Sequence, residues 1–547
     1  MMKKNKSTLR RLIFSAAFRR YSLTVVAAEA VAVLLGAVSP LAQKFMIDGA
    51  SRGTLSAVLY AASVLALLLV GQFALRSLGR LLRGILGVEL HKKLKSDIFR
   101  HLLALPEEFL RSRGAGYFFN RIQHDIGEIG AFVTGNGLLQ YSEMVKLAAA
   151  ALVILYLNWS CLLLLLPFLL LQVFFCYRFR RRQYQLAHQL QECVAQERQL
   201  MQEYLATHTI VKTHSVGASA GERIDDGLSR WGSLMRNRLG HENVFLACLQ
   251  IPMWLCGGSI LLFGLYQVIE QQTTLGEVWA LLMLMNMFFA PARTLGGIIV
   301  QQQSALAAWW RLQELWRTDT EDGAGSVPEV DLRGEVVFDK VVFGYNPSRM
   351  ILNKLSLQVP WGSGVFLCGA NGSGKSTLFS LLLRLYAPGQ GSIKINNCNI
   401  NDYPLAEYRQ RIGYIGQYLE FIPGTLRDNL LMGKTAVSDE TLEALFRQLD
   451  CADLLERLPD KLDTMVAERG ENFSGGERLR LVLVRELLRD TDWLLFDEAA
   501  ANLDMAGRQR FYELLQKLPG QKGVIAIAHD LPENSSWPVL QIEKLQE

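Results

Sequence analysis

The stretch that decides the fold is Gly369-Ala370-Asn371-Gly372-Ser373-Gly374-Lys375-Ser376-Thr377. It matches G-x-x-x-x-G-K-[ST], the pattern of a phosphate-binding loop. The apolar residues 365–368 before it predict a short buried strand, and residues 378–386 after it predict a helix. This order of strand, loop and helix is the context that the motif requires. A chance turn rich in glycine and serine is the alternative, and the context makes it the weaker interpretation.

The chemistry of such a loop explains its composition. Glycines let the backbone curl so that N–H groups point at phosphate oxygens, and the following helix N-terminus adds partial positive charge. Lys375 is expected to reach the β- and γ-phosphates of ATP, and Ser376 to offer its hydroxyl to Mg²⁺. The residues expected to bind the phosphates are Gly369, Asn371, Gly372, Ser373, Gly374, Lys375, Ser376 and Thr377.

The composition points to a membrane protein. Half of the 547 residues are hydrophobic, and the mean hydropathy is positive at +0.16. The net charge of +5 is small for this length, so we infer no nucleic-acid partner from it. The eight cysteines are scattered without a C-x-x-C pair, which favours small core residues over a disulfide framework or a metal site.

Apolar segments of about 20 residues, the length that crosses a bilayer, occur six times. The segment after the basic residues 1–21 is long and shows no small-residue cleavage site, so it predicts a retained membrane helix instead of a signal peptide. The six predicted spans are 22–47, 55–75, 138–157, 159–177, 245–269 and 275–300.

The distribution of Lys and Arg predicts the orientation. With the N-terminus inside, the inside segments 1–21, 76–137 and 178–244 hold seven, ten and ten Lys or Arg residues. The outside loops hold only Arg52. Positive charge concentrates on the cytoplasmic side of membrane proteins. We therefore expect a multi-pass protein of the cytoplasmic (inner) membrane, with both termini and the phosphate loop in the cytoplasm.

The two long inside segments predict membrane helices that continue into water. Each reaches a turn of small residues, at Arg113-Gly114-Ala115-Gly116 and at Val216-Gly217-Ala218-Ser219. The composition changes at a polar linker, after which an α/β pattern begins. The predicted division is therefore a membrane domain at 1–317, a linker at 318–332 and an ATPase domain at 333–547.

A second phosphate-related motif follows an apolar run. Trp493-Leu494-Leu495-Phe496 predicts a buried strand that ends in Asp497 and Glu498. Beside the phosphate loop, Asp497 would hold Mg²⁺ and Glu498 would orient and deprotonate the attacking water. An ordinary strand end with solvated acids is the alternative, and the α/β context favours the functional interpretation.

The stretch Phe473-Ser474-Gly475-Gly476-Glu477 resembles the signature sequence of ABC transporters. In that family the signature serine and glycine amides open a helix and face the ATP held by the opposite nucleotide-binding domain. The resemblance therefore implies that Ser474, Gly475 and Gly476 contact ATP on a second subunit. Glu477 stands where the family usually has Gln, and Phe473 where it usually has Leu. Both changes lie outside the Ser-Gly-Gly core, so we expect function to persist.

Other positions carry the same resemblance. Tyr345 resembles the aromatic residue that stacks on adenine, and Gln417 the glutamine that joins the Mg²⁺ site to the membrane domain. His529 resembles the histidine that touches the γ-phosphate. Glu468-Arg469-Gly470 resembles an exporter-specific loop, and Asn502-Leu503-Asp504 a loop that crosses the dimer interface.

The membrane half is similar to exporter-type members of the family. The resemblance implies that the two turns of small residues are coupling helices, near 111–122 and 208–220. Because only 18 residues follow His529, we expect no C-terminal regulation. Because the stretch before the first span is short, we expect no fused peptidase.

The predicted fold is a multi-domain one, with an all-α polytopic membrane domain followed by an α/β P-loop ATPase domain of ABC type. We expect an exporter-type half-transporter that works as two copies, or as one copy with a related partner, and drives efflux by alternating access. An importer with the same fold and a non-pumping, ATP-switched receptor are the alternatives. The expected catalytic residues are Lys375, Gln417, Glu498 and His529, and the expected Mg²⁺ ligands are Ser376, Gln417 and Asp497.

Ionisable residues inside a membrane are costly and usually functional. Glu29, in the first span, has no partner nearby in the sequence, and we expect it to face a cavity. Glu143 and Lys146, three residues apart in the third span, form either a helix-surface ion pair or a cargo contact. No motif names the cargo, which is a peptide, a lipid or a drug.

Overall fold

The computed structural model describes residues 18–546 except 322, 324, 328, 347, 435–436, 450, 502, 519–520 and 529–535. Within these residues the chain forms two compact units. The helical unit comprises residues 18–103 and 115–318, and the ATPase unit comprises residues 104–114 and 319–546. The segment 104–114 belongs to the ATPase unit, although more than 200 residues separate this segment from residue 319, where the rest of that unit begins. The domain limits predicted from the sequence did not include this assignment.

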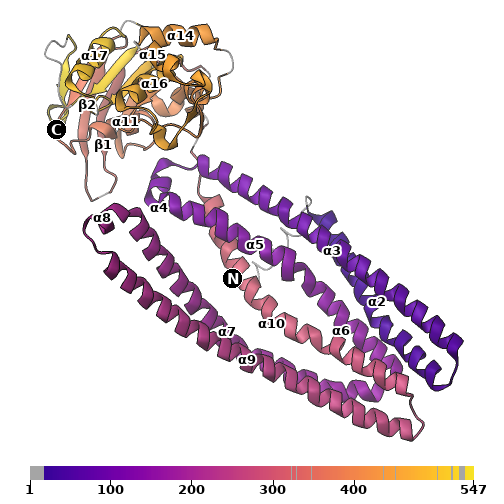
Figure 1. The fold of residues 1–547 in the computed structure, drawn as a ribbon. Helices are drawn as coiled ribbons and strands as arrows, with labels where there is room; N and C mark the ends of the chain where they lie inside the picture. The colour runs from indigo at the N-terminus through magenta and orange to yellow at the C-terminus, as the bar shows by residue number, and fades with distance from the viewer. Residues whose placement is uncertain are drawn as a thin grey trace. The chain divides into compact units, whose positions relative to one another are not determined.

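Long helices build the helical unit (Figure 1). Their bounds are α2 Arg19–Ser51, α3 Leu55–Leu103, α5 Ile126–Phe132, α6 Leu138–Leu157, α7 Trp159–Ala206, α8 His208–Thr213, α9 Gly217–Ile269 and α10 Leu275–Arg317. Helix α4, Glu107–Asn120, is broken at Gly114 and continues through the π-helical turn Arg121–Asp125. In Figure 1, α3 lies along α2 and α9 lies along α7, while α10 runs beside α6.

Polar side chains fix the turns at one end of these helices. The Asn158 side chain accepts hydrogen bonds from the Ser160 and Cys161 amides and so caps α7. Thr274 and Glu277 form a reciprocal capping box that starts α10. Such caps satisfy backbone N–H groups that a helix start leaves unpaired, and so fix where α7 and α10 begin. Both turns lie where the sequence predicts outside loops.

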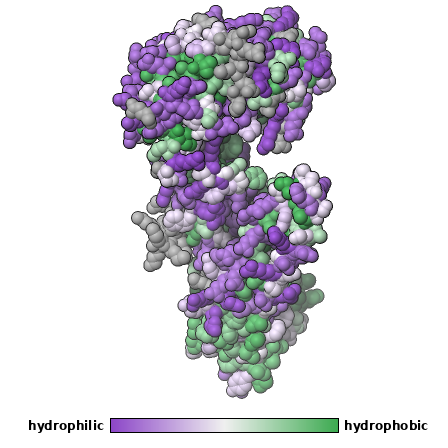
Figure 2. All heavy atoms as spheres, turned by 90° about the vertical axis from the view of Figure 1, so that its left-hand side faces the viewer, coloured by the Kyte–Doolittle hydropathy of each residue, from purple (hydrophilic) through white to green (hydrophobic). Residues whose placement is uncertain are grey.

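Six helical segments among the described residues are long and apolar enough to cross a membrane, which agrees with the predicted number. Figure 2 shows hydrophobic side chains gathered over one end of the helical unit. The exposed large residues include Leu67, Tyr156, Leu262 and Ile269. Exposed apolar surface on helices of this length is typical of a protein that contacts lipid. Helices α3, α7 and α9 continue past the apolar segments, as the sequence predicts: α3, with 49 residues, is roughly 73 Å long.

The Glu29 side chain, which was predicted to face a cavity, forms an ion pair with a neighbouring helix instead. This side chain is buried, and its Oε1 atom lies 3.2 Å from Arg83 Nη2 on α3. A Cβ at Gly79 would come within 2.9 Å of the same carboxylate oxygen, so α3 passes close over Glu29. The predicted cavity-facing role is therefore replaced by an interhelical ion pair between α2 and α3. The partner lies 54 positions along the chain, in a segment expected to be in water, so local sequence could not identify it.

Glu143 and Lys146 form the helix-surface ion pair that was one of the two alternatives. Lys146 Nζ donates to Glu143 Oε1 at 2.6 Å along α6. Glu143 is buried and Lys146 is partly exposed. The pair neutralises both charges, and a cargo contact is not needed to explain them.

A buried carboxylate ties α10 to the segment after α4. Asp125, only 2% exposed at its side chain, accepts hydrogen bonds from Arg311 Nε at 3.0 Å and from Arg311 Nη2 at 2.5 Å. Arg121 Nη1 adds a third bond at 3.2 Å. This fork geometry is the strongest form of a carboxylate–guanidinium contact.

We expect Asp125→Asn to destabilise the helical unit by breaking this cluster. The variant leaves two guanidinium groups facing a neutral amide, and loss of one partner of a buried pair costs roughly 3–5 kcal/mol. Arg311 is 35% exposed, so the cost should fall at the low end of that range. Thermal unfolding of the purified protein in detergent measures the effect. The charge-matched control Glu128→Gln, on α5, should lower the melting temperature much less. Equal melting temperatures for the two variants would contradict a stabilising role of Asp125.

The segments expected as coupling helices are helical but have different bounds. The first lies within α4, which starts four residues earlier than predicted and breaks at Gly114. The second is the single short helix α8, His208–Thr213, and Gly217 already begins α9. The predicted range 208–220 joined these two helices because small residues such as Gly217 and Ala218 gave no sign of a helix start.

Two sheets form the ATPase unit. An antiparallel sheet has the order β2-β1-β4-β5, and a parallel sheet has the order β11-β3-β10-β9-β6. The strands are β1 Val336–Phe343, β2 Leu352–Val359, β3 Gly364–Cys368, β4 Gln390–Ile395, β5 Cys398–Asn399, β6 Ile412–Ile415, β9 Trp493–Asp497, β10 Gly523–Ile527 and β11 Val539–Gln541. A short ribbon pairs β7 Gly424–Thr425 with β8 Met465–Val466. The helices are α11 Lys375–Leu382, α12 Leu405–Gln410, α13 Leu426–Leu431, α14 Asp439–Gln448, α15 Ala452–Arg457, α16 Gly475–Leu487 and α17 Met505–Leu515.

The strand β9 lies inside the core of this unit. All five of its residues are buried, and alternate side chains enter different hydrophobic clusters. Trp493 and Leu495 join one cluster, while Leu494 and Phe496 join the other. A continuous apolar run is typical of a parallel strand covered on both faces. This burial fixes where the carboxylates at the end of β9 come to lie.

Candidate active site

Neighbouring parallel strands bring the predicted site residues to one edge of the sheet. The phosphate loop follows β3, Asp497 ends β9, and Gln417 follows β6. The register pairs Ile527 of β10 with both Leu367 and Asp497, so the ends of the three strands lie side by side. The carboxyl ends of parallel strands are the usual binding edge of an α/β sheet. His529 follows β10 but lies outside the described residues.

The phosphate loop has the geometry that its sequence predicts. Gly374 adopts φ +99° and ends the loop just before α11, where a Cβ would come within 2.6 Å of Leu352. Lys375 is buried at the start of α11, and its ammonium group donates to the carbonyl oxygens of Gly369 at 2.8 Å and Ala370 at 3.1 Å. The lysine charge thus lies across the mouth of the loop, beside the helix N-terminus.

Asp497 contacts the phosphate loop directly. The Ser376 hydroxyl donates to Asp497 Oδ1 at 2.9 Å, and the Tyr414 hydroxyl donates to Oδ2 at 3.3 Å. Burial raises the pKa of Asp497 and the charge of Glu498 adds to this, while the hydrogen bonds from Ser376 and Tyr414 oppose it. Hard oxygen donors of this kind suit Mg²⁺, and a bound cation would favour the ionised carboxylate. Tyr414 was not predicted, because a tyrosine inside β6 carries no motif.

Glu498 lies beside the same loop. The strand ends at Asp497, and Glu498 adopts a left-handed conformation with φ +49° while its amide donates to Ile527 O at 3.2 Å. The carboxylate lines a pocket of about 360 Å³, together with Tyr345, Asn371, Lys375 and Ser376. The chain turn at Glu498, which a simple strand alternation did not predict, places two consecutive carboxylates at one site.

Tyr345 stands at the mouth of this pocket. Its ring is 46% exposed and packs edge-on against Phe343 and Tyr386, with ring centroids 5.1 and 5.0 Å away. Thr377 Oγ1 lies 3.4 Å from its hydroxyl. Burial raises the pKa of Tyr386, and the charge of Arg111, in the segment 104–114 of the same unit, opposes this rise only in part. An exposed aromatic face beside a phosphate loop is suited to stack on a nucleobase.

The predicted signature begins a helix. Ser474 caps α16, and its hydroxyl accepts the Glu477 amide at 3.3 Å. Glu477 reaches back to accept the Ser474 amide at 2.8 Å and the Ser474 hydroxyl at 2.9 Å. Gly475 and Gly476 form the first turn, so two backbone N–H groups and the helix dipole face outward there.

Two protein-family models match this chain and show which family it belongs to. Residues 22–292 match the family described as the ABC transporter transmembrane region, and residues 352–501 match the family described as ABC transporter. The chain is an ABC transporter. It binds ATP and belongs to a class of enzymes that couple ATP hydrolysis to transport across a membrane.

Relatives of this ABC transporter match it over most of its length. The uncharacterized ABC transporter ATP-binding protein YwjA of Bacillus subtilis (strain 168) is 26% identical, over 90% of this chain and 86% of the relative. The ATP-dependent lipid A-core flippase of Chromohalobacter salexigens is 26% identical, over 86% and 82%. A multidrug resistance ABC transporter ATP-binding and permease protein of Lactococcus lactis subsp. lactis is 25% identical, over 85% and 79%.

The fold of the transporter also matches a solved one. The structure of a bacterial Atm1-family ABC exporter with ATP bound superimposes with a TM-score of 0.81 and 22% identity. The match covers 97% of this chain and 95% of that chain. The exporter-type fold predicted from the sequence is therefore confirmed.

Several family positions lie away from the phosphate loop. Gln417 is exposed and lines a separate pocket of about 600 Å³ with Phe421, Arg469, Gly475 and Arg478. The structure therefore brings Gln417 to the same sheet edge as Asp497 but into a different pocket. Asp504 caps α17 through its bond to the Gly507 amide at 2.9 Å. Asn502 lies outside the described residues.

The structure adds a residue that no motif marked. Glu543, near the C-terminus, accepts a hydrogen bond from the Ala370 amide at 2.6 Å. That bond lowers the pKa of the Glu543 carboxyl. Gln546 Nε2 lies 3.4 Å from the Ser373 carbonyl. Both residues support the phosphate loop from the chain end, a contact between segments 173 positions apart that sequence spacing alone does not reveal.

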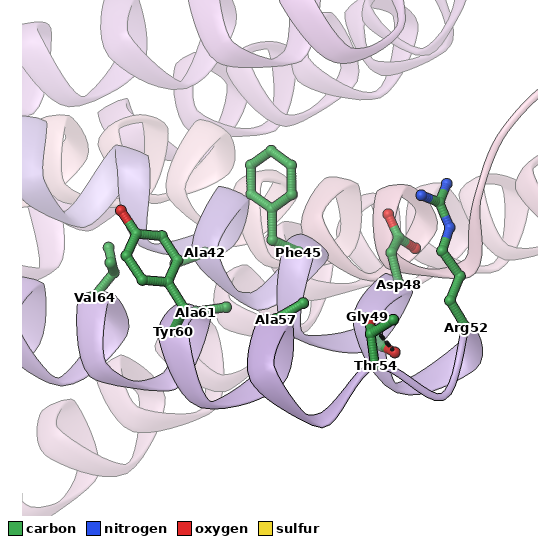
Figure 3. Close-up of a pocket in the computed structure, with 10 residues that line it drawn as sticks. All are labelled: Ala42, Phe45, Asp48, Gly49, Arg52, Thr54, Ala57, Tyr60, Ala61 and Val64. Carbon is green, nitrogen blue, oxygen red and sulfur yellow. Dashed lines mark hydrogen bonds between the residues drawn. The ribbon is translucent and has the colours of Figure 1, made fainter.

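Two of the cavities that the described residues of the helical unit form differ in the polarity of their lining. The larger, of about 1120 Å³, has a mixed lining and lies between the segment after α4, helix α7 and helix α10; its polar lining residues include Gln123, Gln191, Arg198, Gln303 and Arg311. The smaller, of about 320 Å³, is apolar and lies in the α2–α3 hairpin. Figure 3 shows Phe45 and Asp48 from α2 and Tyr60 from α3 around it. Asp48 also accepts bonds from the Thr274 hydroxyl and the Gly276 amide, which ties this hairpin to α10.

Proposed function

We propose that this transporter exports an amphipathic compound from the cytoplasm, as a dimer that closes around two ATP molecules. The observation that carries this proposal is the meeting of three groups at one sheet edge: the phosphate loop, the Ser376–Asp497 contact at 2.9 Å, and Glu498 in the loop pocket. This arrangement holds a nucleotide, supports a cation and offers a base.

Each residue has a defined task in this proposal. The loop amides and Lys375 bind the phosphates, and Tyr345 stacks on adenine. Ser376 and Asp497 would hold Mg²⁺, with Gln417 reaching it when the site closes. When bound, the cation neutralises charge on the β- and γ-phosphates. Glu498 orients and deprotonates the attacking water, and His529 contacts the γ-phosphate.

The dimer follows from the position of the signature. Gln417 and Gly475 line a pocket that contains neither Lys375 nor Glu498. The first turn of α16 therefore does not face the phosphate loop of its own chain, and we propose that it faces ATP on a second copy or a related half-transporter. ATP-driven closure and hydrolysis would then switch the helical units between inward- and outward-facing states. In this proposal the protein lies in the inner membrane and both of its termini lie in the cytoplasm.

The direction and the cargo rest on relatives and on the cavity. Two matched relatives are named as an ATP-dependent lipid A-core flippase and a multidrug resistance ABC transporter, names that specify a lipid and drugs. The cavity between α7 and α10 is large enough for a polar head group, and its lining on these helices, residues 184–202 and 303–311, lies on the cytoplasmic side of the predicted spans. We therefore propose an amphipathic lipid or drug over a hydrophilic peptide. The importer and the ATP-switched receptor are the competing functions.

Transport into inverted membrane vesicles tests this proposal. ATP added outside reaches only transporters whose ATPase units face outward, so uptake into the lumen reports export. The test compounds are a labelled phospholipid, a lipid A-core glycolipid and a cationic hydrophobic drug. We expect at least one to accumulate with ATP and to stimulate ATP hydrolysis. Movement in the opposite direction would indicate an importer, and stimulation without movement would indicate a receptor.

A crosslink tests how the helical segment at α8 and α9 meets an ATPase unit. Phe421 packs against Phe473 and lines the same pocket as Gln417. The family resemblance suggests this glutamine loop as the surface that receives the segment near Gly217. We expect Gly217→Cys paired with Phe421→Cys to crosslink in a background without native cysteines. The control pair Gly217→Cys with Lys517→Cys, an exposed site elsewhere on the ATPase unit, should not react. Failure of Phe421 and its neighbours Leu419 and Glu420 alike, in folded protein, would count against this docking.

A further inference from the structure

The signature of this chain carries its own anion. Glu477 Oε2 accepts the Ser474 amide at 2.8 Å and the Ser474 hydroxyl at 2.9 Å. These two donors lie at the N-terminus of α16, where a bound phosphate would accept hydrogen bonds. An ionised carboxylate only accepts hydrogen bonds, so it holds the hydroxyl proton of Ser474 in place. A glutamine there would offer a weaker, neutral acceptor.

The other oxygen of this carboxylate is also engaged. Arg457, the last residue of α15, donates from Nη2 to Glu477 Oε1 at 2.8 Å. The Glu477 side chain is 15% exposed, whereas Arg457 is 60% exposed and Ser474 is exposed. Arg457 therefore neutralises a carboxylate that lies just behind the exposed serine.

We propose that Glu477 competes with the γ-phosphate of ATP for the Ser474 donors, and that Arg457 limits this competition. The inference rests on the proposed dimer, in which the signature faces ATP on the other copy. Glu477 is a positioning residue: it sets how much ATP is needed to close the site, and it takes no part in the chemical step.

The sign of each substitution follows from charge. In Glu477→Gln only a neutral acceptor holds the Ser474 hydroxyl proton and the γ-phosphate meets no negative charge, so less ATP is needed. In Arg457→Gln the carboxylate keeps its full charge and attracts the Ser474 donors more strongly, so more ATP is needed. Hydrogen bonds to charged groups exceed neutral ones by about 1 kcal/mol, which corresponds to roughly three- to tenfold in concentration.

The test is steady-state ATP hydrolysis by the full-length protein in lipid nanodiscs. We expect Glu477→Gln to lower KM for ATP roughly three- to tenfold and Arg457→Gln to raise it by a similar factor, with kcat changed less than KM in both. The double variant should match Glu477→Gln, because Arg457 reaches Ser474 only through the Glu477 carboxylate. Its contact with Asp453 Oδ2, at 3.5 Å, stays within α15. Glu456→Gln, an exposed neighbour of Arg457, removes the same charge and should leave KM unchanged.

Three results would overturn this inference. Equal KM values for all variants would show that Glu477 does not compete. A double variant with KM well above that of Glu477→Gln would show that Arg457 binds ATP directly. A fall in kcat and melting temperature in both single variants, without opposite shifts of KM, would show that the cluster only stabilises α16.

A separate variant distinguishes failure of the proposed dimer. A Cβ at Gly476 meets only Leu503, at 3.6 Å, so an aspartate fits there and suits the helix N-terminus. Gly476→Asp should nevertheless abolish ATP hydrolysis, because its charge repels the phosphate of the other copy. Full activity of Gly476→Asp would overturn the facing arrangement itself. Loss of activity there, with unchanged KM in the Glu477 and Arg457 variants, would overturn only the competition.

Discussion

Glu498→Gln is expected to lower kcat for ATP hydrolysis by roughly 10²–10⁴, the typical contribution of a positioned general base. The amide keeps the shape of the side chain but cannot accept a proton from the attacking water. ATP binding should survive, because Lys375 and the loop amides, which we propose bind the phosphates, are untouched. The variant should therefore accumulate as an ATP-bound dimer with little turnover.

Phosphate release by the purified protein, together with ATP retained on it, measures both parts of this prediction. Glu513→Gln, an exposed site on α17, changes the same charge on the ATPase unit and should hydrolyse ATP at the wild-type rate. Glu498→Gln that hydrolyses ATP near the wild-type rate would remove Glu498 from the role of catalytic carboxylate.

Lys375→Ala is expected to weaken ATP binding rather than to slow hydrolysis of bound ATP. Its ammonium group is buried at the start of α11 and provides a full positive charge to the phosphates. Hydrogen bonds to charged groups contribute about 1.5–3 kcal/mol each, so Kd should rise by roughly 10- to 100-fold or more. Calorimetric titration with ATP in the Glu498→Gln background measures Kd without turnover.

The control for this variant is Lys517→Ala, which removes an equal charge from an exposed position of the same unit. Its Kd should equal that of the parent protein. An unchanged Kd in Lys375→Ala would mean that the lysine does not contact phosphate, and the placement of ATP on this loop would need revision.

Much of the fold could be predicted because its signals are local. Apolar segments of membrane length, the excess of Lys and Arg in inside loops and the phosphate-loop motif each lie in a continuous stretch. The family, the exporter-type fold and the six spans were predicted in this way, and the comparisons and the structure confirm them. The predicted domain limits and the roles of the site residues stay predictions.

The features that the sequence did not predict depend on contacts between distant segments. Glu29 meets Arg83 on a neighbouring helix, and Glu543, which follows β11, meets Ala370, which follows the adjacent strand β3. Tyr414 reaches Asp497 because β6 and β9 are neighbours in the sheet although 83 positions separate the two residues. Neither a periodic pattern nor a motif encodes such a pairing, since each depends on the tertiary fold.

The central claim is that ATP draws two copies of this chain together, and a distance between two labels tests it most directly. Met505, at the start of α17, is 88% exposed, so a spin label there should not disturb packing. Met505→Cys would be labelled in the Glu498→Gln protein, with the eight native cysteines replaced. Each dimer then carries one label pair. We expect ATP to convert a broad distribution into one short distance, and ADP not to do so. A distribution that ATP leaves unchanged, in protein that binds ATP, would contradict the account.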